Sequence, residues 1–83
     1  MTFTLYIKEF CPYSQKAMAL LSSMNVKYFK HDVLQLGDTA GVIESLKRAK
    51  RIARRSTHCT VPIVFHNGKF IGGCEELAKY LIK

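Results

Sequence analysis

The chain has 83 residues, of which 48% are hydrophobic, and a formal net charge of +7. This length allows one domain, residues 1–83, and excludes a multidomain architecture. The three cysteines, Cys11, Cys59 and Cys74, are too few and too scattered for a disulfide framework. No pair of them has the short spacing of a structural zinc site, so we expect no metal and a fold held by its apolar core.

The sequence has no segment that is typical of a secretory signal or of a membrane span. Residues 1–6 begin directly with a strand-like pattern, without the basic start and apolar run of a signal peptide. No stretch approaches the roughly 18–20 apolar residues that a membrane span needs. Together with the unpaired thiols, this predicts a cytoplasmic protein in a reducing compartment.

Most of the positive charge comes from one segment, residues 47–55, which we call the basic segment. It holds six basic side chains and no acidic one, whereas the rest of the chain holds seven basic and six acidic residues. We interpret it as the solvated face of an amphipathic helix, because its apolar residues fall on one side. We therefore expect no nucleic-acid partner. The alternative is an adaptor that binds an anionic partner or a nucleic acid through this basic helix.

The first part of the chain predicts a strand, a helix and a second strand. Residues 3–7 are aromatic and β-branched, which favours a strand. Pro12 suits the first turn of a helix, since its missing N–H costs nothing there, and Asn25 is typical of a helix end. Residues 26–33 alternate in part and predict the second strand. The buried stripe of the helix is expected at Ala17, Leu20, Leu21 and Met24.

A second helix is predicted after a connection at residues 34–38. Asp38 or Thr39 can cap its first turn. The polar residues 56–60 interrupt the pattern, so we expect the helix to extend through most of the basic segment. Its apolar stripe consists of Val42, Ile43, Leu46, Ala49, Ile52 and Ala53.

The last part of the chain predicts a hairpin and a final helix over residues 75–83. Asn67-Gly68 separates two apolar runs and is a strong signal for a two-residue turn, because both positions need positive φ. Gly72-Gly73 ends the hairpin. The resulting order, β-α-β-α-β-β-α, predicts an α/β fold with a mixed four-stranded sheet and helices on both faces.

Cys11 lies between the first predicted strand and the first predicted helix. The thiolate is the nucleophile in disulfide exchange, and a helix N-terminus lowers the pKa of a thiol through its N–H donors and positive dipole end. Lys8, three residues earlier, adds a nearby cation. We therefore expect an ionised and reactive thiol at Cys11.

Three segments of the chain have the pattern of one known family. Residues 8–14, Lys-Glu-Phe-Cys-Pro-Tyr-Ser, resemble the glutaredoxin motif, in which a lysine lies three residues before Cys-Pro-Tyr-Cys. Thr60-Val61-Pro62 resembles the family's Thr-Val-Pro loop, and residues 70–74 resemble its Gly-Gly segment. The three occur in the family's order over nearly the whole chain. The resemblance implies a thioredoxin-like fold and a glutathione-dependent thiol–disulfide oxidoreductase that acts on glutathionylated or disulfide-bearing proteins; we also expect a monomer.

The resemblance also implies roles for single residues. Cys11 forms the mixed disulfide with glutathione, Lys8 contacts the glycyl carboxylate of glutathione, and Tyr13 lines the groove. A residue of the second helix also contacts that carboxylate in the family, and spacing alone does not choose among four basic candidates. These candidates are Lys47, Lys50, Arg51 and Arg54.

The Thr60-Val61-Pro62 loop and the start of the last helix complete the implied glutathione site. Pro62 is expected to be cis, which turns the backbone N–H and C=O of Val61 toward the cysteinyl part of glutathione. Gly73 allows close backbone approach, and the N–H groups of Cys74 and Glu75 suit the γ-glutamyl carboxylate. The family usually has Asp in place of Glu75.

Ser14 departs from the family pattern, which has a second cysteine at this position. A serine does not resolve a mixed disulfide, so the sequence predicts a monothiol mechanism through Cys11 alone. Three explanations stay open: a natural one-cysteine variant, a serine introduced to trap a glutathione adduct, or a distant resolving cysteine at Cys59 or Cys74. An alternative function is a glutathione-ligated iron–sulfur cluster carrier using Cys11 from two subunits, against which Pro12 argues.

The histidines take no part in this pattern. His31, His58 and His66 are scattered, and no two have the spacing of a metal pair on a helix. We interpret them as surface or loop residues, with His58 closest in sequence to the Thr60-Val61-Pro62 loop.

Overall fold

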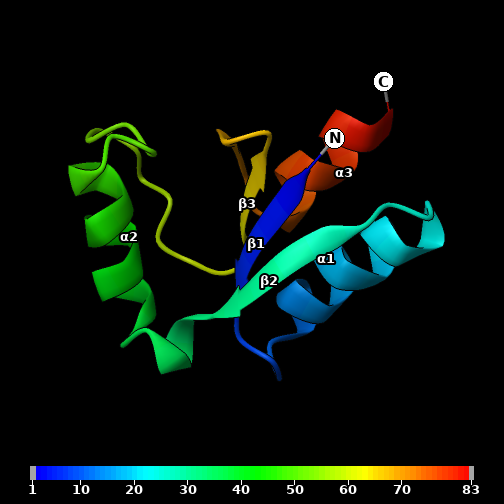
Figure 1. Cartoon of the computed structure of the whole chain (residues 1–83), viewed down its shortest axis with the longest axis horizontal. Coiled ribbons are helices and arrows are strands. Elements are labelled where there is room, and N and C mark those ends of the chain that lie inside the picture. Colours follow the sequence, from blue (N-terminus) through cyan, green and yellow to red (C-terminus); the bar gives the residue numbers. More distant parts are fainter. Residues whose placement is uncertain (1, 83) are drawn as a thin grey trace.

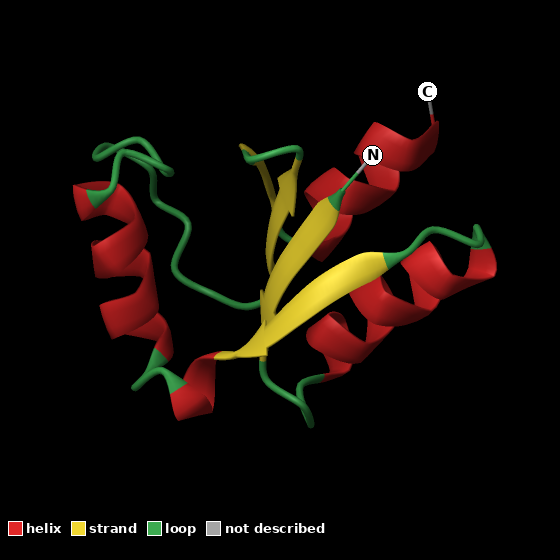
Figure 2. Ribbon diagram, viewed as in Figure 1, coloured by secondary structure: helices red, strands yellow, loops and turns green. Residues whose placement is uncertain are grey.

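A mixed sheet of four strands lies between one helix on one face and two helices on the other (Figures 1 and 2). This computed structural model describes residues 2–82. The predicted element order is confirmed, with one short 3₁₀ helix added. The elements are β1 (Phe3–Ile7), α1 (Pro12–Ser23), β2 (Tyr28–Asp32), the 3₁₀ helix (Val33–Gln35), α2 (Thr39–Arg48), β3 (Ile63–His66), β4 (Lys69–Gly72) and α3 (Cys74–Ile82).

The strand order is β2-β1-β3-β4, so β1 has a neighbour on each side. β2 runs parallel to β1 and is shorter than the predicted residues 26–33. β3 runs antiparallel to β1, with Tyr6 opposite Ile63, and β4 runs antiparallel to β3. This pairing places the end of β1, which leads to Cys11, beside the start of β3, which follows Pro62.

Apolar side chains form a cluster on each face of the sheet, because alternate residues of a strand point to opposite faces. Val64 of β3 joins the cluster on the α1 and α3 face, whereas its neighbours Ile63 and Phe65 join the cluster on the α2 face. The α2-face cluster also contains Val33, Val42, Ile43, Leu46, Ile52 and Val61. The opposite cluster also contains Phe3, Leu5, Ile7, Ala17, Leu21 and Leu77.

α1 ends at Ser23, and Asn25, which was predicted as the helix stop, follows in a Schellman motif. Asn25 has a φ of 60°, its N–H donates to Ser22 O at 3.0 Å, and Val26 N–H donates to Leu21 O at 3.0 Å. Val26 then packs against the cluster that contains Leu21. Met24 was expected in the buried stripe, but it is the C-cap residue and is 47% exposed.

The prediction of one helix through the basic segment is wrong, because α2 ends at Arg48. Lys50 has a φ of 60°. Lys50 N–H donates to Lys47 O at 3.0 Å and Arg51 N–H donates to Leu46 O at 2.8 Å, which closes a second Schellman motif. A lysine, rather than a glycine, therefore ends this helix, and the basic segment is not a continuous helix.

The predicted apolar stripe is only partly correct beyond this helix end. Ile52 is buried, with 2% of its surface exposed, and packs in the α2-face cluster from outside the helix. Ala49 and Ala53, expected on the same stripe, are exposed. By contrast, the predicted cap at the start of α2 is confirmed, since Asp38 Oδ1 accepts a hydrogen bond from Gly41 N–H at 2.6 Å.

The hairpin and the last helix follow the prediction closely. Asn67 and Gly68 have φ values of 52° and 83°, as the two-residue turn requires. α3 begins at Cys74, and Leu77 N–H donates to Gly73 O at 2.9 Å in its first turn. Lys83, expected in this helix, lies outside the described residues. In residues 2–82 no helix has both the length and the apolar character needed to cross a bilayer.

We expect Lys50→Gly to raise the free energy of unfolding by roughly 0.5–1 kcal/mol, because glycine adopts positive φ without the steric cost that a side chain imposes. Lys79→Gly is the matched control, since it removes the same charge from the exposed side of α3 and should cost about 1 kcal/mol. Urea unfolding followed by circular dichroism measures both. A loss of stability in Lys50→Gly would contradict a helix end set by the left-handed backbone of this residue.

Candidate functional site

Cys11 is the N-cap residue of α1 and has an extended backbone, with φ −78° and ψ 124°. Its N–H donates to Lys8 O at 3.1 Å, which closes the turn between β1 and α1. Pro12 follows and has no N–H. The first backbone donors of the helix that remain near the Cys11 side chain are therefore those of Tyr13 and Ser14.

The first turn of α1 lowers the pKa of Cys11. The largest cause is the backbone N–H of Ser14; the backbone N–H of Tyr13 and the Ser14 hydroxyl act in the same direction. Burial is the second-largest influence and opposes them, because desolvation disfavours a thiolate. The Lys8 ammonium lowers the pKa least. No donor closes a full capping hydrogen bond to the sulfur, so the aligned N–H groups act as nearby dipoles.

This lowered pKa couples the charge of Cys11 to folding. Because the folded state depresses the pKa, ionisation stabilises the folded state fully above the ordinary thiol value of about 8.5. The contribution is lost as the pH falls through the lowered value, where the folded thiol binds its proton. At neutral pH, a larger fraction of Cys11 is thiolate than of an unperturbed cysteine.

Ser14 is completely buried in the first turn of α1. Its Oγ accepts a hydrogen bond from Lys8 N–H at 3.2 Å, which leaves the hydroxyl proton to point toward the sulfur of Cys11. Ser14 thus connects the residue after β1 to the start of α1. Position 14 therefore has a structural role here, independent of whether it takes part in redox chemistry.

A groove of about 300 Å³ runs beside the first turn of α1. It is bounded by three segments that are far apart in sequence: the start of α1, the loop before β3 and the start of α3. Lys8, Cys11 and Ser14 are not among its lining residues, although Cys11 packs against the hydrophobic cluster that includes Val61 of the groove. Seven of the residues that the resemblance assigns to glutathione binding line the groove: Tyr13, Thr60, Val61, Pro62, Gly73, Cys74 and Glu75.

Backbone groups are available on two walls of this groove. The Val61–Pro62 peptide bond is cis, as the resemblance implied. Across residues 2–82, the N–H and C=O of Val61 find no backbone hydrogen-bond partner. On the facing wall, Cys74 and Glu75 begin α3, and the first N–H groups of a helix have no partner within it. An extended peptide with a carboxylate matches both walls.

His58 and Glu76 also line the groove, although sequence reasoning assigned neither to it. Glu76 Oε1 accepts a hydrogen bond from Gly73 N–H at 2.7 Å, which caps α3. The Gly-x-x-Glu spacing is half of a capping box, so this contact was recognisable. His58 Nε2 lies 3.3 Å from Pro62 O, and no local spacing signals that contact.

The four basic candidates for the glycyl carboxylate are absent from the groove lining that the described residues form. Lys47 Nζ donates to Ser56 O at 3.0 Å, and Arg51 Cζ lies 5.2 Å from the centroid of an aromatic ring in β3. These two side chains therefore hold the irregular chain after α2 in place. Lys50 and Arg54 are exposed.

The other two cysteines differ in position. Cys59 is exposed in the loop before β3, and Cys74 is half-buried at the first position of α3; both are free thiols. Neither is shown to resolve a disulfide with Cys11. Over residues 2–82, no group of three or more His, Cys, Asp or Glu side chains has the arrangement of a metal site.

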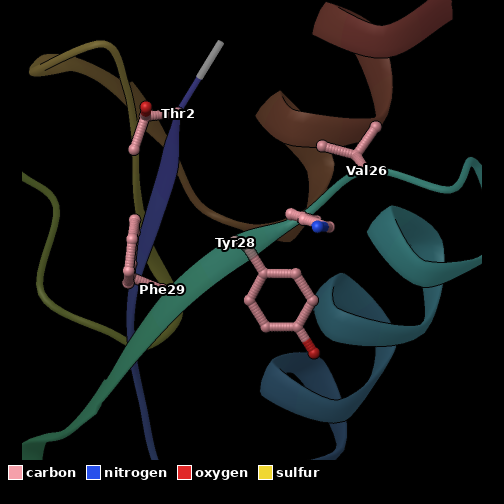
Figure 3. Close-up of a pocket in the computed structure, with 5 residues that line it drawn as sticks. Thr2, Val26, Tyr28 and Phe29 are labelled. Carbon is pink, nitrogen blue, oxygen red and sulfur yellow. The ribbon is translucent and has the colours of Figure 1, made fainter.

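A larger hollow of about 540 Å³ lies at the outer strand β2 (Figure 3). Tyr28 and Phe29 point away from the strand in different directions, and Phe29 is 65% exposed. The lining holds no cysteine, histidine or carboxylate: it consists of Thr2, Val26, Lys27, Tyr28 and Phe29. The smaller groove lies beside a thiol with a lowered pKa, so chemistry rather than volume identifies it as the candidate site.

We expect Ser14→Ala to raise the pKa of Cys11 only part of the way to its ordinary value, because the backbone N–H groups that act on the sulfur remain. The change also leaves Lys8 N–H without its acceptor and should lower the free energy of unfolding by about 1–3 kcal/mol. The pH dependence of iodoacetamide alkylation, measured in a Cys59→Ser, Cys74→Ser background, reports the pKa. Urea unfolding reports the stability.

The matched control is Lys8→Gln, which removes the cation and keeps the backbone donors. Because the Lys8 ammonium has the smallest influence on the pKa, this variant should still alkylate with a depressed pKa. A return to the ordinary thiol pKa in Lys8→Gln would show that the lysine, and not the start of α1, sets the ionisation of Cys11.

Comparison with known proteins relates this geometry to one family. The glutaredoxin family model matches residues 3–71. A probable glutaredoxin of Acanthamoeba polyphaga mimivirus is 35% identical over 82 residues, which cover 96% of this chain and 77% of the relative. Glutaredoxin 3 of Escherichia coli strain K12 is 38% identical over 73 residues, which cover 88% of this chain and 77% of the relative.

Solved structures agree on the fold. The crystal structure of a buckwheat glutaredoxin–glutathione complex matches with a TM-score of 0.77 at 24% identity, over 96% of this chain and 67% of that one. The predicted thioredoxin-like fold is thereby confirmed. From the family match and the two relatives, the chain belongs to the glutaredoxin family, whose members are generally thiol–disulfide oxidoreductases.

Proposed function

We propose that this protein reduces protein–glutathione mixed disulfides by a monothiol route through Cys11. The observation that carries the proposal is the lowered pKa of Cys11 at the start of α1, next to a groove with unpartnered backbone groups. A thiolate at neutral pH attacks disulfides, and a thiol of low pKa also leaves readily from them. Both properties are needed when one cysteine forms and then releases an adduct.

The groove supports glutathione as the ligand. Its cysteinyl part pairs with the N–H and C=O of Val61, in the manner of a short added strand. Its γ-glutamyl carboxylate binds the first N–H groups of α3 at Cys74 and Glu75, where the helix dipole favours an anion. Tyr13 and Thr60 line the groove. The cysteinyl and γ-glutamyl parts of the tripeptide are thus held while its sulfur faces Cys11.

The reaction takes place in two exchanges. The thiolate of Cys11 attacks the glutathione sulfur of the mixed disulfide, the bond between the two substrate sulfurs breaks, and the protein thiolate leaves and takes a proton from water. The thiolate of a second glutathione then attacks the glutathione sulfur of the Cys11 adduct. Cys11 leaves as a thiolate, and oxidised glutathione is released. One glutathione is oxidised for each protein thiol that is restored.

Ser14 determines which class of disulfide substrate this monothiol route reduces. With a protein disulfide as substrate, Cys11 becomes joined to the protein, and a neighbouring thiol is needed to release it. The hydroxyl of Ser14 does not perform that exchange. Substrates that already carry glutathione need no such thiol, so the mixed disulfide is the preferred substrate class. A cytoplasmic location and a monomeric state stay predictions.

Cys11→Ser is expected to reduce turnover of a glutathionylated peptide to the uncatalysed rate, because the nucleophile is lost. The assay couples oxidised glutathione to NADPH consumption through glutathione reductase. Cys59→Ser is the matched control and should keep the wild-type rate, since Cys59 is exposed outside the first turn of α1. Turnover that survives in Cys11→Ser rules out the proposed function.

Ser14→Cys is expected to add the reduction of an intramolecular peptide disulfide, which the wild-type chain performs poorly. The new thiol lies in the first turn of α1, where it can attack a disulfide on Cys11 and release the substrate. Oxidised Ser14→Cys should then contain a disulfide between positions 11 and 14, which mass spectrometry detects. If the variant keeps mixed-disulfide turnover but gains no protein-disulfide reduction, Ser14 is not what limits the substrate range.

A further inference from the structure

His58 contacts both of the segments that face each other across the groove. Its Nε2 lies 3.3 Å from Pro62 O on one wall. On the other wall, its Cε1 lies 3.2 Å from the position that a β-carbon would take at Gly73. The ring also meets Phe70 edge-on, with ring centroids 5.4 Å apart. Pro62 O lies 3.6 Å from the same β-carbon position, so the imidazole packs beside the point where the loop before β3 meets the start of α3.

The polar contact of this ring has a defined direction. A carbonyl oxygen only accepts hydrogen bonds, so Nε2 of His58 carries the hydrogen and donates it to Pro62 O. The backbone of His58 is itself fixed, because its N–H donates to Ser56 Oγ at 3.3 Å. The contact thus ties the carbonyl of Pro62 to a ring whose adjacent carbon, Cε1, lies against Gly73.

The loop that receives this hydrogen bond is anchored by the burial of Val61 and Pro62, but its backbone has few polar partners. No helix or strand lies between Arg48 and Ile63. Within the described chain, the N–H and C=O of Val61 make no backbone hydrogen bond. Any backbone freedom that this loop keeps must be lost when the ligand binds, and this ordering weakens binding.

We propose that His58 is a positioning residue that holds the Thr60–Pro62 loop against the start of α3 and so prepares the groove for the glutathione part of the substrate. The inference rests on the proposed function of the groove. His58 contributes to substrate affinity although it takes no part in the exchange of sulfurs. His58 affects binding and leaves the thiolate unchanged, since none of the causes that lower the pKa of Cys11 involves it.

Two substitutions separate the hydrogen bond from the packing of the ring. His58→Phe keeps an aromatic ring against Phe70 and Gly73 but cannot donate to Pro62 O. His58→Gln keeps an N–H donor on a side chain of similar reach. We expect His58→Phe to raise KM for a glutathionylated peptide roughly three- to tenfold, the factor that one intramolecular hydrogen bond typically contributes. His58→Gln should return KM to within about twofold of wild type.

Two further readouts identify a positioning role. In both variants kcat and the pH profile of Cys11 alkylation should match wild type, since α1 sets the thiolate. An unchanged KM in His58→Phe, an equal rise in both variants, or a fall in kcat alone would overturn the proposal. If thermal unfolding shows that His58→Phe does not fold, His58→Met replaces it, because Met is smaller and has no donor. The same changes in KM, kcat and alkylation are then expected of His58→Met.

The wild-type chain in the same assay separates this inference from the proposed function. If wild type does not turn over the glutathionylated peptide, the proposed function itself fails. If wild type turns over the peptide and His58→Phe shares its KM, only the role of His58 fails.

Discussion

The site depends on the alignment of backbone N–H groups at the start of α1 with the sulfur of Cys11. Pro12 begins the helix without a donor of its own, so the donors of Tyr13 and Ser14 are the ones that act on the thiolate. They are fixed by the helix and lose no side-chain freedom when they stabilise charge. The lysine at position 8, although conspicuous in the sequence, has the smallest influence on this pKa.

Much of the fold was predictable because its signals are local. Asn25 ends α1, Asp38 caps α2, and Asn67-Gly68 forms the hairpin turn, each through hydrogen bonds or backbone angles that involve only a few neighbouring residues. The segments that line the groove were identified from a resemblance. Their meeting at one place follows from the pairing of β1 with β3, which brings the loop before β3 next to the start of α1.

The parts that were not predictable carry no signal in their residue types or spacing. Lys50 adopts positive φ, a conformation that its residue type does not signal, so the end of α2 was missed. Ile52 was correctly expected to be buried, but it reaches the core from an irregular chain and not from a helix face. His58 was expected to be a surface or loop residue and does lie in a loop, but nothing in its neighbourhood reveals that its ring contacts both Pro62 and Gly73.

Cys11 also lies where the two layers of the core meet. Its side chain packs against the cluster on the α2 face, whereas α1, which ionises it, is fixed through Ala17 and Leu21 in the cluster on the opposite face. Detachment of either layer would return this sulfur to the sluggish behaviour of a thiol in an unfolded chain. The raised thiolate fraction of Cys11 is therefore a property of the assembled fold and not of its local sequence alone.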